Sequence, residues 1–423
     1  MTTTAVRPLV SAPPQGVALL EDKLRIPRPG LAVLPRARIG ALMDAAVTRR
    51  VTLMTGPPGA GKTMAAALWA AGRPVSRRPG WVSIDTGDVE PGRFWRYVAA
   101  ALSKTGAIPG AKAGLPGGMA AAEIPPWISA KLRPGGEPVV LVLDDVHLLA
   151  GSDSLAGLDE LVRHEPAGLR LVLAGRSAPG LTLSRLRLEG ELADIGAADL
   201  ACTADEMAAY FKMLGTPLGS AEQDQLLRQT EGWLAGLRLT ALAGQAVQAS
   251  QSPQSPSAPE ASAASVATAG TGQAGVQALV ADYLEDEVLS SQSAGVRAFM
   301  MRTSLTRTVS ADLARELTGE TGAARLFDNL SRETGLVQAL APDSGEYRYH
   351  PMLRDVLAVS LRRELPEDVP ALQRRVAGWH AARGEVLPAV QAAAEVGEWE
   401  FALQLVREAG PVVMFSPDRK SVV

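Results

Sequence analysis

The sequence predicts an α/β domain, a parallel sheet with helices on both faces, followed by a series of helical domains. Uninterrupted apolar runs at 51–55, 139–143 and 169–174 alternate with helical segments, as strands buried on both faces of a parallel sheet require. After Asp199 the pattern becomes helical. A chain of 423 residues is also too long for one hydrophobic core, so we expect several domains.

Composition excludes several classes of protein. The formal net charge is −3, so no overall basic field points to a nucleic-acid partner. The single cysteine, Cys202, excludes an internal disulfide and favours a reducing compartment. No apolar stretch is long enough to span a membrane, and residues 1–16 lack the pattern of a signal peptide. We therefore expect a cytoplasmic protein without a membrane partner.

The segment 56–63 matches G-x-x-x-x-G-K-[ST] in full, between the 51–55 run and a predicted helix at 62–71. In such a P-loop, glycines let backbone N–H groups surround phosphates at the helix N-terminus. We expect Lys62 on the β and γ phosphates and Thr63 on magnesium. A chance match in a glycine-rich chain is the alternative, but the strand–loop–helix context favours ATP or ADP binding. The expected nucleotide-binding residues are Gly56, Pro57, Pro58, Gly59, Ala60, Gly61, Lys62 and Thr63.

Two further strands end in candidate catalytic groups. The run 139–143 is followed by Asp144, expected to hold Mg²⁺, and Asp145, expected to polarise the attacking water. The alternative is a buried strand that ends in two solvated acids. Arg176 follows the 169–174 run at the edge where ligands of parallel sheets bind, and it either senses the γ-phosphate or is a surface arginine. His147 is interpreted as a loop histidine.

The remainder of the chain divides by composition and period. A capping box at Thr203 and Glu206 opens a helical stretch, and 245–275 is Gln-, Ser-, Ala-, Pro- and Thr-rich with Glu260 as its one charge. Helices followed by strand-like runs at 336–340 and 347–350 suggest a winged helix. We therefore divide the chain into a disordered lead (1–22), a P-loop nucleotide-binding domain (23–200), a helical lid (201–244), a disordered linker (245–275), a winged-helix domain (276–365), the start of a helical, TPR-like solenoid (366–410) and a tail (411–423).

With these motifs the chain resembles the signal-transduction ATPases with numerous domains (STAND). More closely, it is similar to the large ATP-binding LuxR-type transcriptional regulators, which include the activator of the maltose regulon. The similarity extends from about residue 20 to 408. The motifs that carry it are, besides the P-loop, K-L-R-I-P-R-P at 23–29, L-P-R-A-R at 34–38, R-F-W-R-Y at 93–97, L-D-D-V-H at 143–147, A-G-R-S-A-P at 174–179, E-G-W-L-A-G-L at 231–237 and Y-R-Y-H-P-M-L-R-D at 347–355.

The resemblance implies further roles. His350 matches the winged-helix histidine that contacts the β-phosphate of ADP in a closed resting state. Arg36 or Arg38 matches a strap beside the adenine, and Trp233 belongs to the lid motif under the base. The resemblance also implies a switch: ADP holds the closed state, exchange for ATP permits self-association, and slow hydrolysis resets the protein.

Members of this family continue into a sensor arm that binds an inducer and a helix-turn-helix that binds DNA. In this sequence the arm ends after about one hairpin and no basic helix-turn-helix follows, so we expect a fragment that carries the switch without those domains. A STAND ATPase with a defence or scaffold role is an alternative. A plain catalytic P-loop enzyme is another, although the sequence offers no acceptor site or basic channel.

Overall fold

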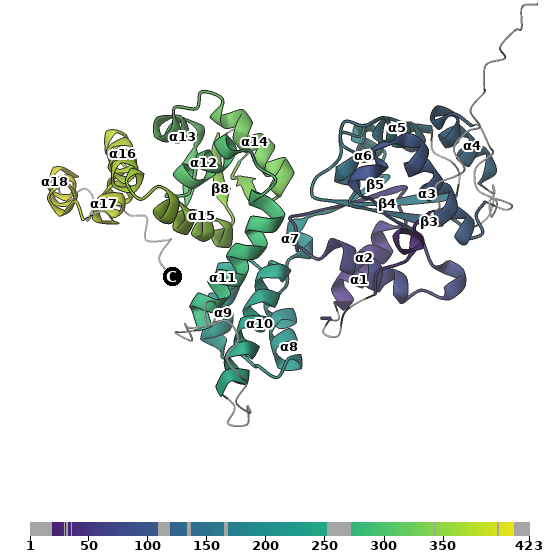
Figure 1. Cartoon of the computed structure of the whole chain (residues 1–423), viewed down its shortest axis with the longest axis horizontal. Helices are drawn as coiled ribbons and strands as arrows, with labels where there is room; N and C mark the ends of the chain where they lie inside the picture. The colour runs from purple at the N-terminus through teal and green to yellow at the C-terminus, as the bar shows by residue number, and fades with distance from the viewer. Residues whose placement is uncertain are drawn as a thin grey trace, which may run out of the picture.

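The computed structural model describes residues 19–28, 30, 33–34, 36–108, 119–132, 137–164, 168–251, 272–341, 344–395 and 397–409. The predicted tail and all but the last residues of the predicted lead lie outside this part. Figure 1 shows two lobes, with the parallel sheet in one and the winged helix and last helices in the other. The helices α8 to α11 lie between and below them in this view.

The first lobe contains a five-stranded parallel sheet in the order β2-β3-β4-β1-β5. Because β4 lies between β1 and β3, the loops that follow these three strands meet at one carboxyl edge. The predicted apolar runs correspond to β1, β3 and β4, and the short β5, with a single buried residue at Ile195, was missed. The strands are β1 (Val51–Thr55), β2 (Gly80–Ser83), β3 (Val139–Asp144), β4 (Leu169–Gly175) and β5 (Leu192–Ile195).

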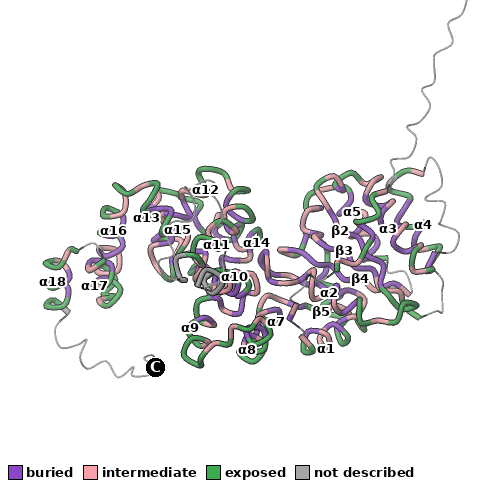
Figure 2. Tube along the Cα trace, turned by 60° about the horizontal axis from the view of Figure 1, so that its bottom comes forward, coloured by how far each residue is buried: buried purple, intermediate pink, exposed green. Residues whose placement is uncertain are grey.

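Helices cover both faces of this sheet, which explains the uninterrupted apolar runs. Leu141 and Leu143 of β3 belong to a core shared with α3 and α5, whereas Val142 belongs to the core shared with α1 and α2. The strands are accordingly buried inside this lobe (Figure 2). The helices are α1 (Ala37–Ala46), α2 (Lys62–Ala71), α3 (Pro91–Lys104), α4 (Ile124–Lys131), α5 (Asp153–His164), α6 (Ser184–Leu188) and α7 (Ala197–Leu200).

The lid follows, with α8 (Ala204–Met213), α9 (Ser220–Thr230) and α10 (Leu234–Gln251). Thr203 and Glu206 form the predicted capping box at the start of α8. Next come α11 (Gly272–Leu284) and a π-helical turn, η7 (Glu285–Leu289). Both α10 and α11 extend into the segment assigned to the linker from sequence, and residues 252–271 of that segment lie outside the described part.

The second lobe is a winged helix followed by three helices of a solenoid. Its sheet is antiparallel in the order β6-β8-β7, and β6, of only three residues, was not predicted. Phe327 stacks on Tyr347 at 4.5 Å between ring centroids and centres this core. The elements are α12 (Ala294–Thr303), β6 (Thr308–Ser310), α13 (Ala311–Thr318), α14 (Ala323–Thr334), β7 (Val337–Ala339), β8 (Glu346–Tyr349), α15 (Pro351–Glu364), α16 (Asp368–Ala382), α17 (Val386–Glu395) and α18 (Trp399–Ala409).

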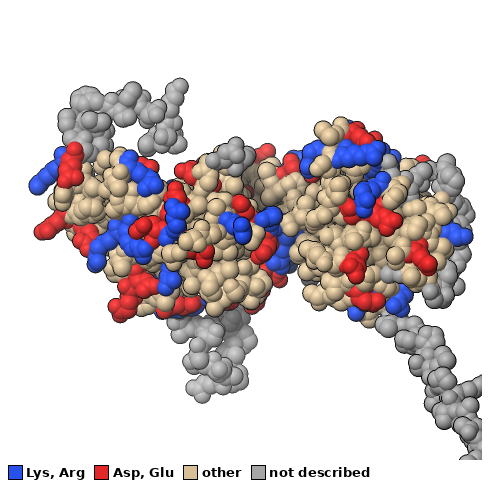
Figure 3. Space-filling model, turned by 90° about the horizontal axis from the view of Figure 1, so that it is seen from above, with Lys and Arg blue, Asp and Glu red and all other residues tan. Residues whose placement is uncertain are grey.

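The predicted fold class is confirmed: an α/β P-loop domain is followed by a helical lid, a winged helix and the start of a solenoid. Charges of both signs alternate over both lobes on the face seen in Figure 3, in keeping with the net charge of −3. None of the helices within the described ranges has the length and apolar character needed to cross a bilayer.

Candidate functional site

The P-loop lies between β1 and α2 and requires glycine at two positions. Gly59 and Gly61 have φ of +72° and +87°, the left-handed region that disfavours side chains. Space is restricted as well, because a Cβ on Gly59 would lie 2.4 Å from the Cβ of Ala235, and one on Gly61 would lie 2.5 Å from Cδ1 of Leu234. The first turn of α10 therefore packs directly on the loop.

Lys62 is a buried cation whose partners are backbone carbonyls. Its Nζ donates to the carbonyl oxygens of Gly56 at 2.8 Å and Pro57 at 2.9 Å, and the residue is 7% exposed. Burial lowers the pKa of Lys62 to about 8, opposed by the charges of Asp145 and Asp144. Within the described residues no carboxylate lies in ion-pair contact with Nζ. A cation in this setting is well placed to receive an anion.

Asp144 and Thr63 meet at the carboxyl edge of the sheet. The Thr63 hydroxyl donates to Oδ1 of Asp144 at 3.0 Å. Burial, together with the charge of Asp145, raises the pKa of Asp144 to about 6. Asp145 itself has φ of 59°, a strained conformation for a residue with a side chain, and burial raises its pKa too. The two aspartates thus lie beside the P-loop, at the carboxyl edge where β1 and β3 end.

Arg176 follows β4 at the same edge, but its guanidinium forms hydrogen bonds with Glu287 of η7. It donates to the carbonyl of Glu287 at 2.9 Å and to the Glu287 carboxylate at 3.1 Å. His147 lies nearby, and burial, followed by the charges of Arg176 and Lys62, lowers the pKa of this histidine to about 4. Sequence reasoning missed Glu287, because nothing in the chain links two residues 111 positions apart.

A short segment that we call the lid turn, Thr230–Trp233, connects α9 to α10 and touches both lobes. The indole N–H of Trp233 donates to the carbonyl of Pro58 at 2.7 Å. Just after the turn, the backbone N–H of Ala235 donates to the carbonyl of Gly59 at 3.0 Å. Gly232 has φ of +75°, and a Cβ there would lie 2.6 Å from the carbonyl oxygen of Cys202. The turn is therefore tightly specified by its sequence.

His350, at the start of α15 in the winged helix, contacts the lid turn at Thr230. Its Nε2 lies 3.0 Å from the carbonyl oxygen of Thr230 and its Nδ1 lies 3.3 Å from the Met352 N–H. A carbonyl can only accept and an N–H can only donate, so the ring is neutral with its proton on Nε2. Burial lowers the pKa of His350 accordingly. Its ring also meets Trp233 edge-on at 5.4 Å between centroids.

Further contacts hold the winged helix against this site. Arg348 forms a two-point ion pair with Glu231 of the lid turn, at 2.6 and 3.2 Å. Gly335, after α14, touches the P-loop itself, because a Cβ there would lie 3.0 Å from the nitrogen of Pro57. Arg348 and Glu231 lie in two of the family motifs, at 347–355 and 231–237, and this position was the one indication in the sequence that they matter to the site. Gly335 offered no such signal.

Arg36 and Arg38 connect the N-terminal strap to the start of the lid. Arg36 donates to the carbonyl of Ala201 at 2.8 Å and to Glu206 at 3.1 Å. Arg38 donates to the carbonyls of Asp199 at 2.8 Å and Ala201 at 2.9 Å. Both guanidinium groups are thus bound by the chain itself, and their position beside an adenine stays a prediction.

The described residues contain no cluster of three or more His, Cys, Asp or Glu side chains arranged to hold a metal ion. Thr63 and Asp144 alone are a suitable partial set for Mg²⁺, which usually keeps several waters and takes phosphate oxygens as further ligands. The structure thus brings together the P-loop, Thr63, Asp144, Asp145, Arg176, Trp233 and His350, and places Arg36 and Arg38 at the strap.

Comparisons with known proteins agree with this geometry. A sequence profile of the MalT winged helix domain matches residues 285–369. The chain is 32% identical over 374 residues to the HTH-type transcriptional regulator MalT of Serratia proteamaculans, covering 86% of this chain and 39% of that protein. It is 30% identical over 397 residues to the MalT of Cronobacter sakazakii, covering 90% and 41%.

The chain therefore spans about two fifths of the length of these curated relatives (39% and 41%). Among solved structures, a Walker-type ATPase of Pyrococcus abyssi matches with a TM-score of 0.53 and 13% identity, covering 78% of this chain and 98% of that chain, a likeness of fold. With the P-loop and winged-helix geometry above, these matches show that the chain has a P-loop ATPase fold and is similar to the HTH-type transcriptional regulators MalT.

Proposed function

We propose that this chain is an ATP/ADP-binding switch, the ATPase core of a LuxR-type transcriptional regulator. One observation carries the proposal: the winged helix is held against the P-loop through the lid turn. The turn donates to Pro58 on one side through Trp233 and accepts from His350 on the other through Thr230. Occupancy of the P-loop and position of the winged helix are therefore coupled through four consecutive residues.

The residues of the site fit a nucleotide. Lys62 is a buried cation that lacks a carboxylate partner among the described residues, and the left-handed glycines Gly59 and Gly61 shape the loop for phosphates. Thr63 and Asp144 would hold Mg²⁺ with phosphate oxygens and water. The nucleotide, when bound, would supply the negative charge and the phosphoanhydride bond. We propose Arg36, Arg38 and Trp233 as the residues nearest its base.

Asp145 and Arg176 would carry a slow hydrolysis. Asp145 has a side chain that is 47% exposed, so water can reach it, and its raised pKa makes the carboxylate a better proton acceptor. Arg176 would have to exchange Glu287 for the γ-phosphate. In the contact seen here it is engaged by the second lobe, which favours a protein that turns over slowly while closed.

The closed arrangement is proposed to be the ADP-bound resting state, with His350 on the β-phosphate. Both His350 ring nitrogens are occupied by backbone groups, so this contact requires His350 to exchange its bond with Thr230. The flanking ion pairs, Arg176–Glu287 and Arg348–Glu231, are partly exposed and contribute at most about 1 kcal/mol each. Two packings so close in free energy can be exchanged by a ligand.

The ATP state would release the winged helix and permit self-association. The relatives are named HTH-type transcriptional regulators. Since this chain spans 39–41% of their length, inducer recognition and DNA binding are proposed for the family's further domains. A cytoplasmic location fits such a regulator.

The test is the nucleotide carried by the purified chain, released by denaturation and identified by chromatography. We expect about one ADP per chain. His350→Ala should speed ADP release at least about tenfold if the histidine contributes 1.4 kcal/mol or more to retention. His164→Ala, at an exposed histidine on α5, is the matched control and should leave release unchanged. A site that exchanges freely and hydrolyses ATP briskly would contradict the switch and favour a plain catalytic enzyme.

A further inference from the structure

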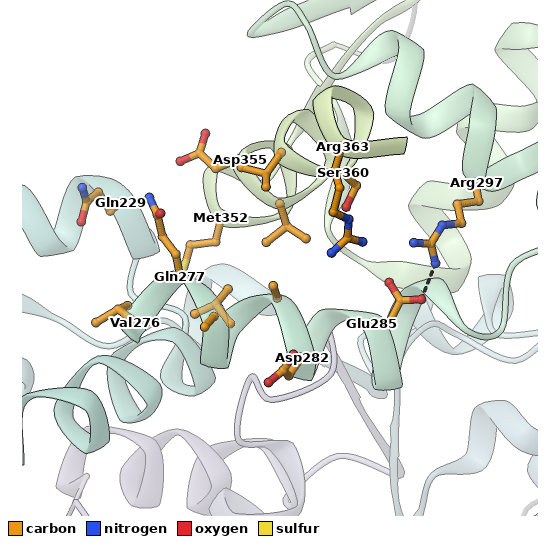
Figure 4. Close-up of a pocket in the computed structure, with 15 residues that line it drawn as sticks. Gln229, Val276, Gln277, Asp282, Glu285, Arg297, Met352, Asp355, Ser360 and Arg363 are labelled. Carbon is orange, nitrogen blue, oxygen red and sulfur yellow. Dashed lines mark hydrogen bonds and ion pairs between the residues drawn. The ribbon is translucent and has the colours of Figure 1, made fainter. Parts of the chain in front are cut away.

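A cavity of about 380 Å³ lies outside the nucleotide site, between α11 and α15, with the end of α9 at one side (Figure 4). Its volume lies within the range of roughly 300 to 1,000 Å³ typical of small-molecule sites. Its walls come from three parts of the fold: the lid, the helix that follows it and the winged helix. None of the residues assigned above to nucleotide binding or hydrolysis lines it.

The floor of this cavity is apolar and regular. Met352, Val356 and Val359 line the cavity from α15 at a spacing that belongs to one face of a helix, and Val280 lines it from α11. Val359 is 55% exposed, which is unusual for a valine and places it at the mouth. Such a floor suits a hydrocarbon chain.

One end of the cavity carries hydrogen-bond donors on the same face of α15. Ser360 is 7% exposed, and its hydroxyl has no hydrogen-bond partner among the described residues. Arg363, one turn further, donates from a single terminal nitrogen to Glu364 at 3.1 Å, and in Figure 4 its guanidinium points into the gap. A serine hydroxyl and a guanidinium that line the cavity from one face of α15 are suitable donors for a carboxylate.

Glu364 pairs with Arg363, but none of the acids that line the cavity does so among the described residues. Glu285 is paired with Arg297 beside the cavity. Asp355 is paired with Arg354 at 3.0 Å, and in Figure 4 its carboxylate is directed away from the gap. Asp282 lies on the side of α11 away from α15.

We propose that this cavity binds an aliphatic monocarboxylate of medium chain length, with its hydrocarbon on the valines and Met352 and its carboxylate on Ser360 and Arg363. The walls connect it to the switch. The side chain of Met352 packs against Gly236 of α10, and the hydroxyl of Tyr283 on α11 packs against Gly59 of the P-loop. Resting on the proposed function, the ligand stabilises the closed state and slows ADP release, because α9, α11 and α15 form the cavity together.

The test is calorimetric titration of the full chain with octanoate, octanol and octylamine below their micellar concentrations. We expect octanoate to bind once per chain, more tightly than the other two, and about fourfold tighter than heptanoate, as one buried methylene predicts. Arg363→Ala should weaken octanoate binding at least about tenfold. Arg362→Ala, at the adjacent arginine that does not line the cavity, is the matched control.

A third variant, Val359→Trp, should block the cavity mouth without touching the donors. Equal binding of octylamine and octanoate, or octanoate binding unchanged in Arg363→Ala, would overturn the site. ADP release is measured separately, and octanoate that binds as expected without slowing ADP release would overturn the coupling alone. A parent chain that retains ADP normally but does not bind octanoate would overturn the site and leave the proposed switch intact.

Discussion

Two lysines of the nucleotide-binding lobe are buried to the same extent but have opposite surroundings. Lys23, in the N-terminal strap, is 8% exposed, and its Nζ forms ion pairs with Asp88 and, at 3.1 Å, with Asp85. It also lies 4.5 Å from the centre of the Tyr97 ring. Lys62, in the P-loop, is 7% exposed, and among the described residues its Nζ forms hydrogen bonds with carbonyl oxygens alone.

The difference separates a structural cation from a functional one. A buried charge is costly unless it is paired, so the contacts of Lys23 are complete and fix the strap to the loop before α3. The ammonium of Lys62 has carbonyl partners but no anionic one among the described residues, and a phosphate would supply it. Residue type and burial are alike in the two regions, so the partner atoms decide the role. Replacement of lysine by methionine removes the charge at either position and keeps most of the side-chain volume.

Lys23→Met should have the largest effect. It leaves Asp88, which is fully buried, with Arg93 as its one remaining cationic partner, so we expect the free energy of unfolding to fall by about 3 kcal/mol. Urea denaturation followed by circular dichroism measures this. ADP affinity of the folded protein should change little. A loss below about 0.5 kcal/mol, as for a surface ion pair, would remove the structural half of the comparison.

Lys62→Met should change stability in the opposite direction. Without nucleotide, removal of a buried and incompletely paired charge is expected to raise the free energy of unfolding by about 2 kcal/mol. ADP affinity should fall at least about a hundredfold, since the cation on the phosphates is lost. Unfolding curves and ADP titration provide the two readings. If the nucleotide-free variant lost as much stability as Lys23→Met, Lys62 would be a structural residue as well.

The pH dependence of the Lys62 effect should be the smallest of the three. Burial lowers the pKa of Lys62 to about 8 in the folded chain, whereas the unfolded chain keeps the usual lysine value near 10.4. Between these values the unfolded state binds more protons, so stability rises with pH. The free energy of unfolding of Lys62→Met should exceed that of the parent by its full amount below pH 8. This difference should shrink by about 1–2 kcal/mol at pH 9.5. A difference in the free energy of unfolding that does not change with pH would contradict the lowered pKa of Lys62.

Much of the nucleotide-binding lobe could be predicted because its signals are local. The strand at 51–55 and the helix at 62–71 match β1 and α2 residue for residue, since an apolar run, a glycine loop and a closing glycine define them. Thr63 and Asp144 were both assigned to Mg²⁺, one from the P-loop and the other from the acids that follow the run 139–143, and they lie in contact. The strands β5 and β6 were missed because each has one buried residue, Ile195 and Val309, and therefore little apolar pattern.

The partners that join the lobes could not be predicted in the same way. His350 was singled out through family resemblance, but its partner is a backbone carbonyl, at Thr230, which every residue possesses. The pair of Arg176 and Glu287 depends on how the lobes dock. The linker limits shifted because α10 and α11 continue helically through residues whose composition indicates disorder.

The lid turn has one more consequence. Because the same four residues contact both the P-loop and the winged helix, a change in one of these contacts also changes the other. A substitution at Gly232, which would displace the turn from Cys202, should alter ligand retention and lobe separation together. Selection for a longer or shorter resting period can therefore act on the backbone conformation of the lid turn.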